Sequence, residues 1–358
     1  MTLEAHRAAL RRQHEDRRAE RPREHARDAA RALGTTEAEL VDATPRRAPG
    51  ARGPGVTPLD PSRLREVFPA FATLGVVKTM TRNEHAVLER WGAFESVEAG
   101  PGPLGQVVGT DIDLRLFFDH LASGFAVVEP GRSEGTWRRS VQLFDRQGDS
   151  AFKVYLEEQS RVDAFEAIAR TLAAPADAAV AVSPPPVPSP PRTIDDGEID
   201  AFREAWDAMT NTHQFFGLLR RFGVGRAQAL SIAGPSRARR VDVAAAGHVL
   251  DAVAAREQPV MIFVGSRGVL QIHVGPVRRV AIVDGWVNVL DREVNVHLRE
   301  AGIARAWVVR KPTDDGVVTS LELLGADGEP VALLFSKRKP GQHEVPAWPA
   351  LLGGLEGA

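Results

Sequence analysis

Histidine is the side chain in this sequence best suited to hold a metal-containing ligand. The 358 residues contain ten histidines and no cysteine, and no two histidines stand at the spacing that places both on one helix face. The sequence also lacks H-E-x-x-H, G-x-S-x-G and P-loop motifs, which argues against a zinc protease, a serine hydrolase and a nucleotide cradle. What remains is a site built around one histidine.

His213 has the surroundings that such a site requires. In DAFREAWDAMTNTHQFFGLLRRFG, Thr210 or Thr212 can N-cap a helix that contains HQFFGLLRR. A histidine in the first turn faces the positive end of the helix dipole, which favours the neutral, metal-binding imidazole. Phe215 and Phe216 could border a flat hydrophobic ligand such as haem, which needs one axial histidine because the porphyrin supplies four nitrogens. The alternative is a helix-start histidine packed by two core phenylalanines.

Three further side chains have both a chemical and a structural interpretation. His85, in TRNEHAVLERW, is either a ligand or a solvated or hydrogen-bonded strand histidine, and His273, in VLQIHVGPV, could face either side of its strand. Arg115 lies between apolar residues in TDIDLRLFFDHL, and a buried arginine must be paired or bind an anion. Pairing with Asp111 or Asp113 is the ordinary explanation for it.

Basic residues at strand ends and at the N-terminus also have two interpretations. Lys311 in WVVRKPT and the cluster Lys337, Arg338 and Lys339 in FSKRKPG could bind carboxylates, and exposed strand-end cations are the alternative. The Arg-rich N-terminal segment interleaves its arginines with acids, which indicates a solvated, salt-bridged helix. RNA binding is a weak hypothesis there, because no aromatic residues stand among the arginines.

Composition limits the chemistry and the compartment. The chain is 43% apolar and 26% charged with a net charge of −2, which gives no reason to expect nucleic acid. The absence of cysteine excludes disulfides, cysteine-ligated zinc or iron–sulfur centres and a cysteine nucleophile. No apolar run approaches the ~20 residues that span a bilayer, and the N-terminal segment has no apolar h-region. We therefore expect a soluble cytoplasmic protein without membrane insertion.

A proline-rich segment divides the chain into two halves that resemble one another. We place this linker at 173–193 and expect it to be extended and semi-rigid. SVQLFDRQGDSAFKVYL, from Ser140, aligns without gaps on SLELLGADGEPVALLFS, from Ser320. Each segment predicts a β-hairpin with a turn at Gly148 or Gly328. The matching order of several elements indicates duplication.

Each half begins with helices and continues with strands. ARALGTTEAELVDA around Gly34 resembles LRRFGVGRAQALSIA around Gly223, and both are helical in pattern. Strand patterning is clear in the second half over 260–265, 268–275, 278–291 and 305–311. Strands with Gly and Asp turns that follow runs of helices favour an antiparallel α+β fold. We predict a tandem repeat of two similar domains, 1–172 and 194–358, each an antiparallel β-sheet with flanking helices.

Taken together, these segments resemble the hemin-degrading factor family, the HemS/ChuX-like cytoplasmic haem-handling proteins of bacteria. The resemblance covers nearly the whole chain outside the linker and the first residues. The matching stretches are RNEHAV at Arg82, DLRLF at Asp113, MTNTHQFFGLLRRFGV at Met209, GSRGVLQIHVGPV at Gly265, GWVNVLDREVNVHL at Gly285 and WVVRKPTDDGVVTSLEL at Trp307.

The resemblance implies that haem b (iron protoporphyrin IX) is held in a cleft and gripped by both repeats. His213 stands at the family's proximal haem ligand, in its T-H-x-F-F context, and is the implied metal ligand. Arg115 stands at the distal arginine, the implied catalytic residue, and Phe117 lies beside it in sequence. An arginine on that face would hold a water or a bound oxygen by hydrogen bonds rather than ligate the iron strongly.

Three more residues match family positions. Arg226, in GVGRAQ, and Lys311 match basic positions suited to the haem propionates, and His85 matches a histidine proposed for a second, N-terminal site in some members. Two features depart from the family pattern. The linker is longer and richer in proline, and the last strand reads LLFSKRKPG where relatives tend to carry an aromatic pair and a glycine.

The implied function is haem binding in bacterial haem uptake and iron acquisition, with the haem either degraded to release iron or delivered onward. The alternative is a pure carrier that hands haem to a separate haem oxygenase. An interaction protein that has lost its ligand is a third hypothesis, opposed by the retained His213. The implied partners besides haem are a haem ABC importer, a haem oxygenase or an electron donor.

Overall fold

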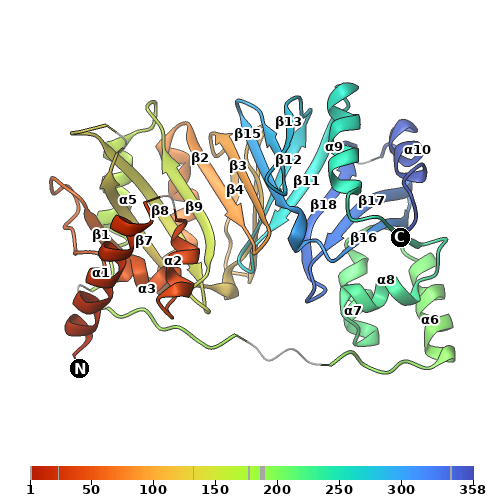
Figure 1. Ribbon diagram of the computed structural model, residues 1–358, viewed down its shortest axis with the longest axis horizontal. Helices are drawn as coiled ribbons and strands as arrows, with labels where there is room; N and C mark the ends of the chain where they lie inside the picture. The colour runs from red at the N-terminus through yellow and green to blue at the C-terminus, as the bar shows by residue number, and fades with distance from the viewer. Residues whose placement is uncertain (1, 23, 132, 176–177, 186–189, 339–340) are drawn as a thin grey trace. The chain divides into compact units, whose positions relative to one another are not determined.

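The chain forms two compact units. The computed structural model describes residues 2–22, 24–131, 133–175, 178–185, 190–338 and 341–358. Unit 1 comprises Met1–Arg82, Glu89–Pro186 and Ser266–Gln271, and unit 2 comprises Asn83–Leu88, Val187–Gly265 and Ile272–Ala358. Each unit combines antiparallel strands with helices (Figure 1).

Unit 1 contains a five-stranded antiparallel array in the order β1-β7-β8-β9-β2 and a smaller meander, β4-β5-β6. Its strands are β1 (Gly55–Leu59), β2 (Val77–Arg82), β4 (Ser96–Glu98), β5 (Leu104–Val108), β6 (Asp113–Phe117), β7 (Leu121–Pro130), β8 (Trp137–Asp145) and β9 (Ser150–Leu156). Its helices are α1 (Leu3–Glu20), α2 (Ala26–Ala32), α3 (Glu37–Asp42), α4 (Val67–Phe71) and α5 (Val162–Thr171), with short 3-10 turns at Pro61–Glu66, Ala72–Leu74 and Phe118–His120.

Unit 2 repeats this plan, with the order β10-β16-β17-β18-β11 and a meander, β13-β14-β15. Its strands are β10 (Ala238–Val241), β11 (Val260–Gly265), β13 (Val280–Val283), β14 (Trp286–Leu290), β15 (Val294–Arg299), β16 (Arg305–Thr313), β17 (Gly316–Leu324) and β18 (Pro330–Ser336). Its helices are α6 (Asp196–Asp207), α7 (Gln214–Phe222), α8 (Arg226–Ile232), α9 (Ala245–Ala255) and α10 (Ala347–Gly353), with a 3-10 turn at Glu300–Gly302.

The equivalent strand orders confirm the predicted fold class, an α+β tandem repeat of antiparallel sheets with flanking helices. The two predicted hairpins are β8–β9 and β17–β18, and their turn glycines, Gly148 and Gly328, have φ of 77° and 85°. Only glycine adopts this left-handed backbone without strain. The boundaries 1–172 and 194–358 stay a prediction about the repeats.

The two units exchange short segments of chain. Strand β3 (Ala86–Gly92) begins in unit 2, where Leu88 lies in the apolar core, and β12 (Val269–Gly275) begins in unit 1, where Val269 does the same. The Asn83 side chain donates to the carbonyl of Val331, 2.9 Å away in unit 2. Each unit is therefore completed by residues from the other half of the sequence.

The linker is bound to unit 1 over part of its length. The Arg7 guanidinium donates to the carbonyl of Ala178 at 2.7 Å, and the Ser183 amide donates to the carbonyl of Arg146 at 2.7 Å. Positions 176–177 and 186–189 lie outside the described residues. The linker is thus extended as expected, but its described part packs on the protein and is not a free tether.

In unit 2, α6, α7 and α8 form one helical group over β16 (Figure 1). Phe202, Trp206 and Phe215 are fully buried there and pack with Trp307 and Val309 of β16. The indole N–H of Trp206 donates to the carbonyl of Arg310 at 2.9 Å. Burial of these aromatic rings fixes α7, the helix that follows His213, against the sheet.

Candidate functional site

His213 is the N-cap residue of α7, with φ of −70° and ψ of −25°. The predicted caps, Thr210 and Thr212, are wrong. The Thr210 amide donates to Gln214 Oε1 at 2.8 Å and its hydroxyl accepts from Gln214 Nε2 at 3.2 Å, so this side chain serves Gln214 instead of the helix amides. His213 therefore stands just before the first helical turn, and its side chain is exposed.

The backbone that carries His213 is held at several points. Its amide donates to Asn211 Oδ1 at 3.1 Å. The carbonyl of Thr210 accepts from the amide of Asp314, which lies in the turn between β16 and β17, at 2.9 Å. Met209 is buried against the helical group. An exposed imidazole on a fixed backbone can meet a ligand without ordering a loop, which lowers the entropy cost of binding.

Phe215 and Phe216 have opposite environments. Phe215 is buried, with its ring centroid 5.1 Å from that of Trp206 in an edge-on arrangement. Phe216 is 59% exposed. The alternative of two core phenylalanines is therefore wrong for Phe216, whose ring adds apolar surface three residues after His213. The start of α7 thus carries two exposed side chains three positions apart, the imidazole of His213 and the phenyl ring of Phe216.

A buried triad of charges lies beneath Phe215. Glu322 on β17 is completely buried and accepts from Arg226 at 2.6 Å and, through its other oxygen, from Lys311. Arg226 lies 5.0 Å and the Lys311 ammonium 4.5 Å from the centroid of the Phe215 ring, both within cation–π range. The expectation of an exposed strand-end lysine is wrong, because β16 continues to Thr313 and Lys311 is 4% exposed.

The ionisation of the triad follows from its geometry. Burial alone would raise the pKa of the Glu322 carboxyl, but Lys311 and Arg226 outweigh it and lower that pKa to about 2. Burial lowers the pKa of Lys311, and Arg226 lowers it further, against the opposing effect of Glu322. Two cations and one anion leave a net positive charge beneath α7.

The sequence analysis did not select Glu322, although the residues around it indicate a buried charge. In Ser320–Leu324 it is the one ionisable residue of a strand segment that is otherwise Ser and Leu. Carboxylates are almost never fully buried without a partner, so a glutamate in such a strand predicts a buried cation nearby. Its counterpart in the hairpin alignment is Gln142, which carries no charge.

Arg115 and Phe117 lie on β6 in unit 1. Asp113, Arg115 and Phe117 alternate with buried leucines, so the three half-buried side chains share one face of the strand. Arg115 forms an ion pair with Asp113, which confirms one of its two predicted partners, while Asp111 pairs with Arg90. Burial raises the pKa of the Asp113 carboxyl, and Arg115 partly offsets that rise.

The other two candidate histidines, His85 and His273, lie far from α7 in sequence and differ in burial. His85 is not a strand residue, because it lies in the turn between β2 and β3, where its carbonyl accepts from the amide of Arg299 in unit 2. His273 is buried on β12 at 3% exposure. Among the described residues no cluster of three or more histidine, aspartate and glutamate side chains could hold a metal ion.

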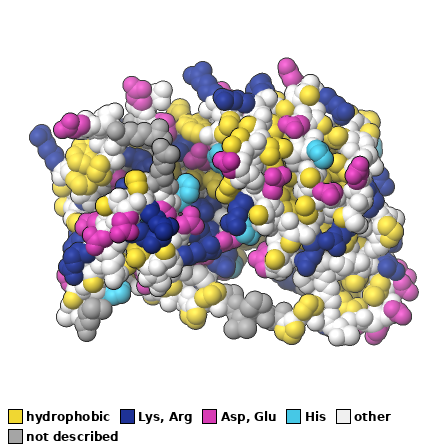
Figure 2. Space-filling view, in the orientation of Figure 1, with side chains coloured by type: hydrophobic (Ala, Val, Ile, Leu, Met, Phe, Trp, Pro, Cys, Tyr) yellow, Lys and Arg dark blue, Asp and Glu magenta, His cyan; other side chains and the backbone are white. Residues whose placement is uncertain are grey.

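The N-terminal helix is largely exposed, as predicted, but it also makes buried contacts. Arg7 is buried and forms an ion pair with Asp42 at 2.8 Å. Basic and acidic side chains lie interspersed over this helical part of the visible face (Figure 2). In the C-terminal cluster, Arg338 lies 3.6 Å from Asp315, and Lys339 lies outside the described residues.

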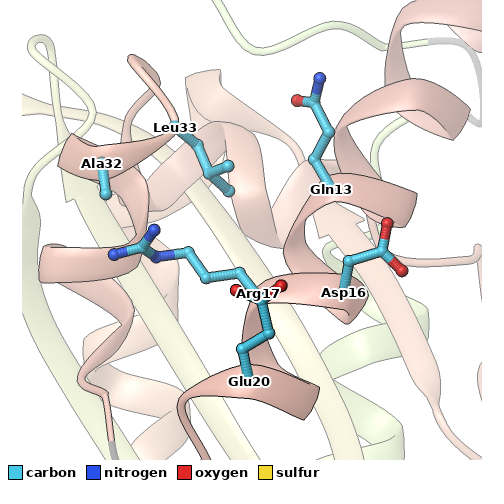
Figure 3. Close-up of a pocket in the computed structure, with 6 residues that line it drawn as sticks. All are labelled: Gln13, Asp16, Arg17, Glu20, Ala32 and Leu33. Atoms are coloured by element: carbon cyan, nitrogen blue, oxygen red, sulfur yellow. The ribbon is translucent and has the colours of Figure 1, made fainter.

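A polar cavity of about 470 Å³ lies between α1 and the end of α2, lined by Gln13, Asp16, Arg17, Glu20, Ala32 and Leu33 (Figure 3). Arg17 is paired with Glu24 at 2.5 Å. The lining has neither a histidine nor an aromatic ring, so this cavity offers a planar apolar ligand little. The start of α7 remains the better candidate site. Within the described part of the chain, no helix is long and apolar enough to cross a membrane.

Comparison with known proteins agrees with the predicted fold and family. The family of the haemin-degrading HemS/ChuX domain matches residues 6–172 and 223–355. The hemin transport protein HmuS of Yersinia pestis is 38% identical over 343 residues, 95% of each chain.

Several solved structures resemble this chain over nearly its whole length. Holo-PhuS, a heme-binding protein from Pseudomonas aeruginosa, is 40% identical, with a TM-score of 0.90 over 98% of this chain and 99% of that one. ChuS, a heme degrading enzyme of Escherichia coli O157:H7, is 31% identical, with a TM-score of 0.87 over 98% and 99%. The likeness therefore extends over both units.

Proposed function

This chain belongs to the family of haemin-degrading HemS/ChuX-domain proteins, and we propose that it binds haem through His213 in bacterial haem uptake and iron acquisition. The observation that carries the proposal is the start of α7, where an exposed imidazole on a fixed backbone is followed by the 59% exposed ring of Phe216. Neutral imidazole is the ordinary proximal ligand of haem iron, and apolar rings line haem pockets. The residues present therefore fit the group.

The residues have separate proposed tasks. When bound, haem supplies an iron centre that can be oxidised and reduced; its form is proposed to be haem b. His213 binds the iron, and Phe216 covers part of the porphyrin. Arg226 and Lys311 supply positive charge to a ligand that carries two carboxylates. In unit 1, Arg115 with Phe117 is proposed as a further haem contact, in which the guanidinium donates hydrogen bonds.

The relatives are described with two activities, haem transport and haem degradation, and both are candidates for this protein. HmuS is described as a hemin transport protein and ChuS as a heme degrading enzyme. We propose that this protein receives haem in the cytoplasm, after import by a haem ABC importer, and either degrades it with an electron donor or passes it on. The second candidate function is a carrier without turnover that delivers haem to a haem oxygenase. His85 stays proposed for a second haem contact.

The proposal is tested by titrating the purified protein with hemin and following the Soret band, which should saturate near one hemin per chain. To separate the two activities, the loaded protein is then given a reductant and oxygen with catalase present. Carbon monoxide and a bile-pigment-like product support degradation. A stable Soret band that moves to an added haem oxygenase supports the carrier. A protein that develops no Soret band contradicts both.

Replacement of Phe216 by alanine is expected to weaken hemin binding several-fold, because about 1 kcal/mol of apolar contact is lost. Stability should not change, since the ring is mostly exposed in the free protein. The measurement is a hemin titration beside a thermal melt. Ile282→Ala, which removes a 52% exposed side chain from β13 of the same unit, is the matched control and should leave affinity unchanged. Equal affinities for Phe216→Ala and wild type would remove Phe216 from the site.

Replacement of Arg115 by alanine is expected to change hemin affinity by less than about threefold, since a single hydrogen bond contributes little net free energy. It should shift the Soret maximum and change the rate at which azide binds to the loaded protein, because a hydrogen-bond donor is removed. Arg138→Ala, which breaks the surface pair with Glu129, is the control. If Arg115→Ala and Arg138→Ala give the same spectra and azide rates, Arg115 is not a haem contact.

A further inference from the structure

The buried carboxylate of Glu322 joins the three elements that surround the start of α7. Its two oxygens hold Arg226, the first residue of α8, and Lys311, on β16. A third donor, the hydroxyl of Ser320, lies 3.2 Å from the oxygen that Lys311 uses. Without Glu322 the two cations would be buried together with no anion between them, which is strongly unfavourable.

Both cations act on Phe215, which is the second residue of α7. Their charged groups lie 4.5 and 5.0 Å from the centroid of its ring, which also packs edge-on against Trp206. Arg226 also lies 5.6 Å from the centroid of Phe216, the exposed ring of the proposed site. The charges therefore contact the first turn of α7, which carries Phe216 and directly follows His213.

Unit 1 contains an ion pair at a neighbouring place, with the charges reversed, on the strand residue that faces Gln142, the counterpart of Glu322. Glu37, the first residue of α3, pairs with Lys153 on β9 at 3.1 Å, and both side chains are buried. Burial would raise the pKa of Glu37, but Lys153 and Arg82 outweigh it and lower that pKa. This pair resembles the one between Arg226 and Glu322 in its place on the fold.

Around its ion pair, unit 1 has different residues at the positions that correspond to His213 and Phe215. The helices that precede α3 and α8 end at left-handed glycines, Gly34 and Gly223, with φ of 67° and 62°. Counted back from these glycines, Glu24 stands where His213 stands, and Ala26 where Phe215 stands. Lys153 does lie 5.7 Å from the centroid of Phe144, but that ring belongs to β8 in the sheet. The pair in unit 1 therefore stabilises the helix–sheet contact with neither a histidine nor an aromatic ring at the positions of His213 and Phe215, which makes it a control for stability alone.

We propose that Glu322 is a positioning residue for haem binding, which holds Arg226 and Lys311 against Phe215 and so fixes the turn that presents His213 and Phe216. The proposal rests on the proposed haem-binding function and deepens it. Glu322 does not itself contact haem; it acts through the two cations and the ring. Loss of the carboxylate should therefore loosen the start of α7 before any ligand is added.

The test compares Glu322→Gln with the matched control Glu37→Gln, at a temperature where circular dichroism shows both to be folded. Hydrogen exchange in the free proteins should become faster at the amides of 214–218 in Glu322→Gln and remain as in wild type in Glu37→Gln. Titration then uses hemin and hemin dimethyl ester, in which the carboxylates are blocked. Glu322→Gln should bind both about tenfold more weakly, because a shared axial ligand is displaced. Glu37→Gln should bind both as wild type does.

Two results overturn the proposal. If exchange at 214–218 and both affinities are unchanged in Glu322→Gln, the carboxylate does not position α7. If only hemin weakens and the ester does not, Glu322 acts on the ligand carboxylates instead of the helix. Should Glu322→Gln fail to fold, Glu322→Asp carries the test, with an intermediate effect expected and wild-type values counting against the proposal. A wild-type protein that binds neither compound removes the proposed function, while the exchange measurement still decides whether Glu322 fixes the turn.

Discussion

Replacement of His213 by alanine is expected to weaken hemin binding by at least about tenfold, equivalent to about 1.4 kcal/mol, and to shift the Soret maximum. The reason is that the side chain is exposed at the N-cap of α7, where its imidazole is available as an axial ligand. The measurement is a spectrophotometric titration of the variant and of wild type. Stability should be unchanged, because the exposed imidazole contributes no cap hydrogen bond.

The control is His248→Ala, which removes another exposed histidine of unit 2, on α9. This variant should bind hemin with the affinity and spectrum of wild type. Added imidazole should restore the wild-type Soret position to His213→Ala but leave His248→Ala unaltered. An unchanged spectrum and affinity in His213→Ala would mean that another residue binds the iron.

Replacement of Glu322 by glutamine is expected to destabilise the protein at neutral pH by on the order of 3 kcal/mol, since it leaves two buried cations without an anion. The folded-state pKa of Glu322 is about 2, below its ordinary value of 4.5. A lowered pKa stabilises the fold above the unfolded value, and that stabilisation is lost as pH falls from 4.5 towards 2. The difference between wild type and variant should therefore be largest above pH 5 and shrink in acid. Urea unfolding across this pH range measures it.

Two further variants make this result specific. Glu322→Gln combined with Lys311→Met has the same net charge in the triad as wild type, so it should recover part of the stability but keep the flattened acid dependence. Glu66→Gln removes an exposed carboxylate paired with Arg63 and should have no measurable effect. If wild type and Glu322→Gln lose stability in parallel as the pH falls, Glu322 is not the group that titrates.

The parts of this fold that follow local sequence rules were predictable. Two strand-like stretches around a glycine turn, at Gly148 and at Gly328, defined both hairpins because strand composition and turn geometry are local properties. Duplication was visible for the same reason, since equivalent local signals recur in order. The family resemblance then favoured His213 as a haem ligand, which pattern alone left open between a ligand and a packed helix-start residue.

What the sequence could not predict depends on which side chains pair with one another. Thr210 has a good capping side chain, but Gln214 engages it, and His213 becomes the N-cap. Lys311 looks like an exposed strand end until Glu322, on the neighbouring strand, gives it a buried partner. At Thr210 the competing contact is local, four residues along the chain, whereas at Lys311 a tertiary contact overrides the local preference. The triad itself needs one helix and two strands to meet, which no single window of sequence contains.

The exchange of short segments between the halves affects how the chain folds during its synthesis. Unit 1 requires residues 266–271, which the ribosome adds long after the rest of that unit. Until then the first half carries incomplete strand edges, which are prone to wrong pairing and aggregation. Contacts so distant along the chain also slow folding. If residues 1–172 and 194–358 are made as separate chains, each is therefore expected to lack strand residues that its unit takes from the other half of the sequence.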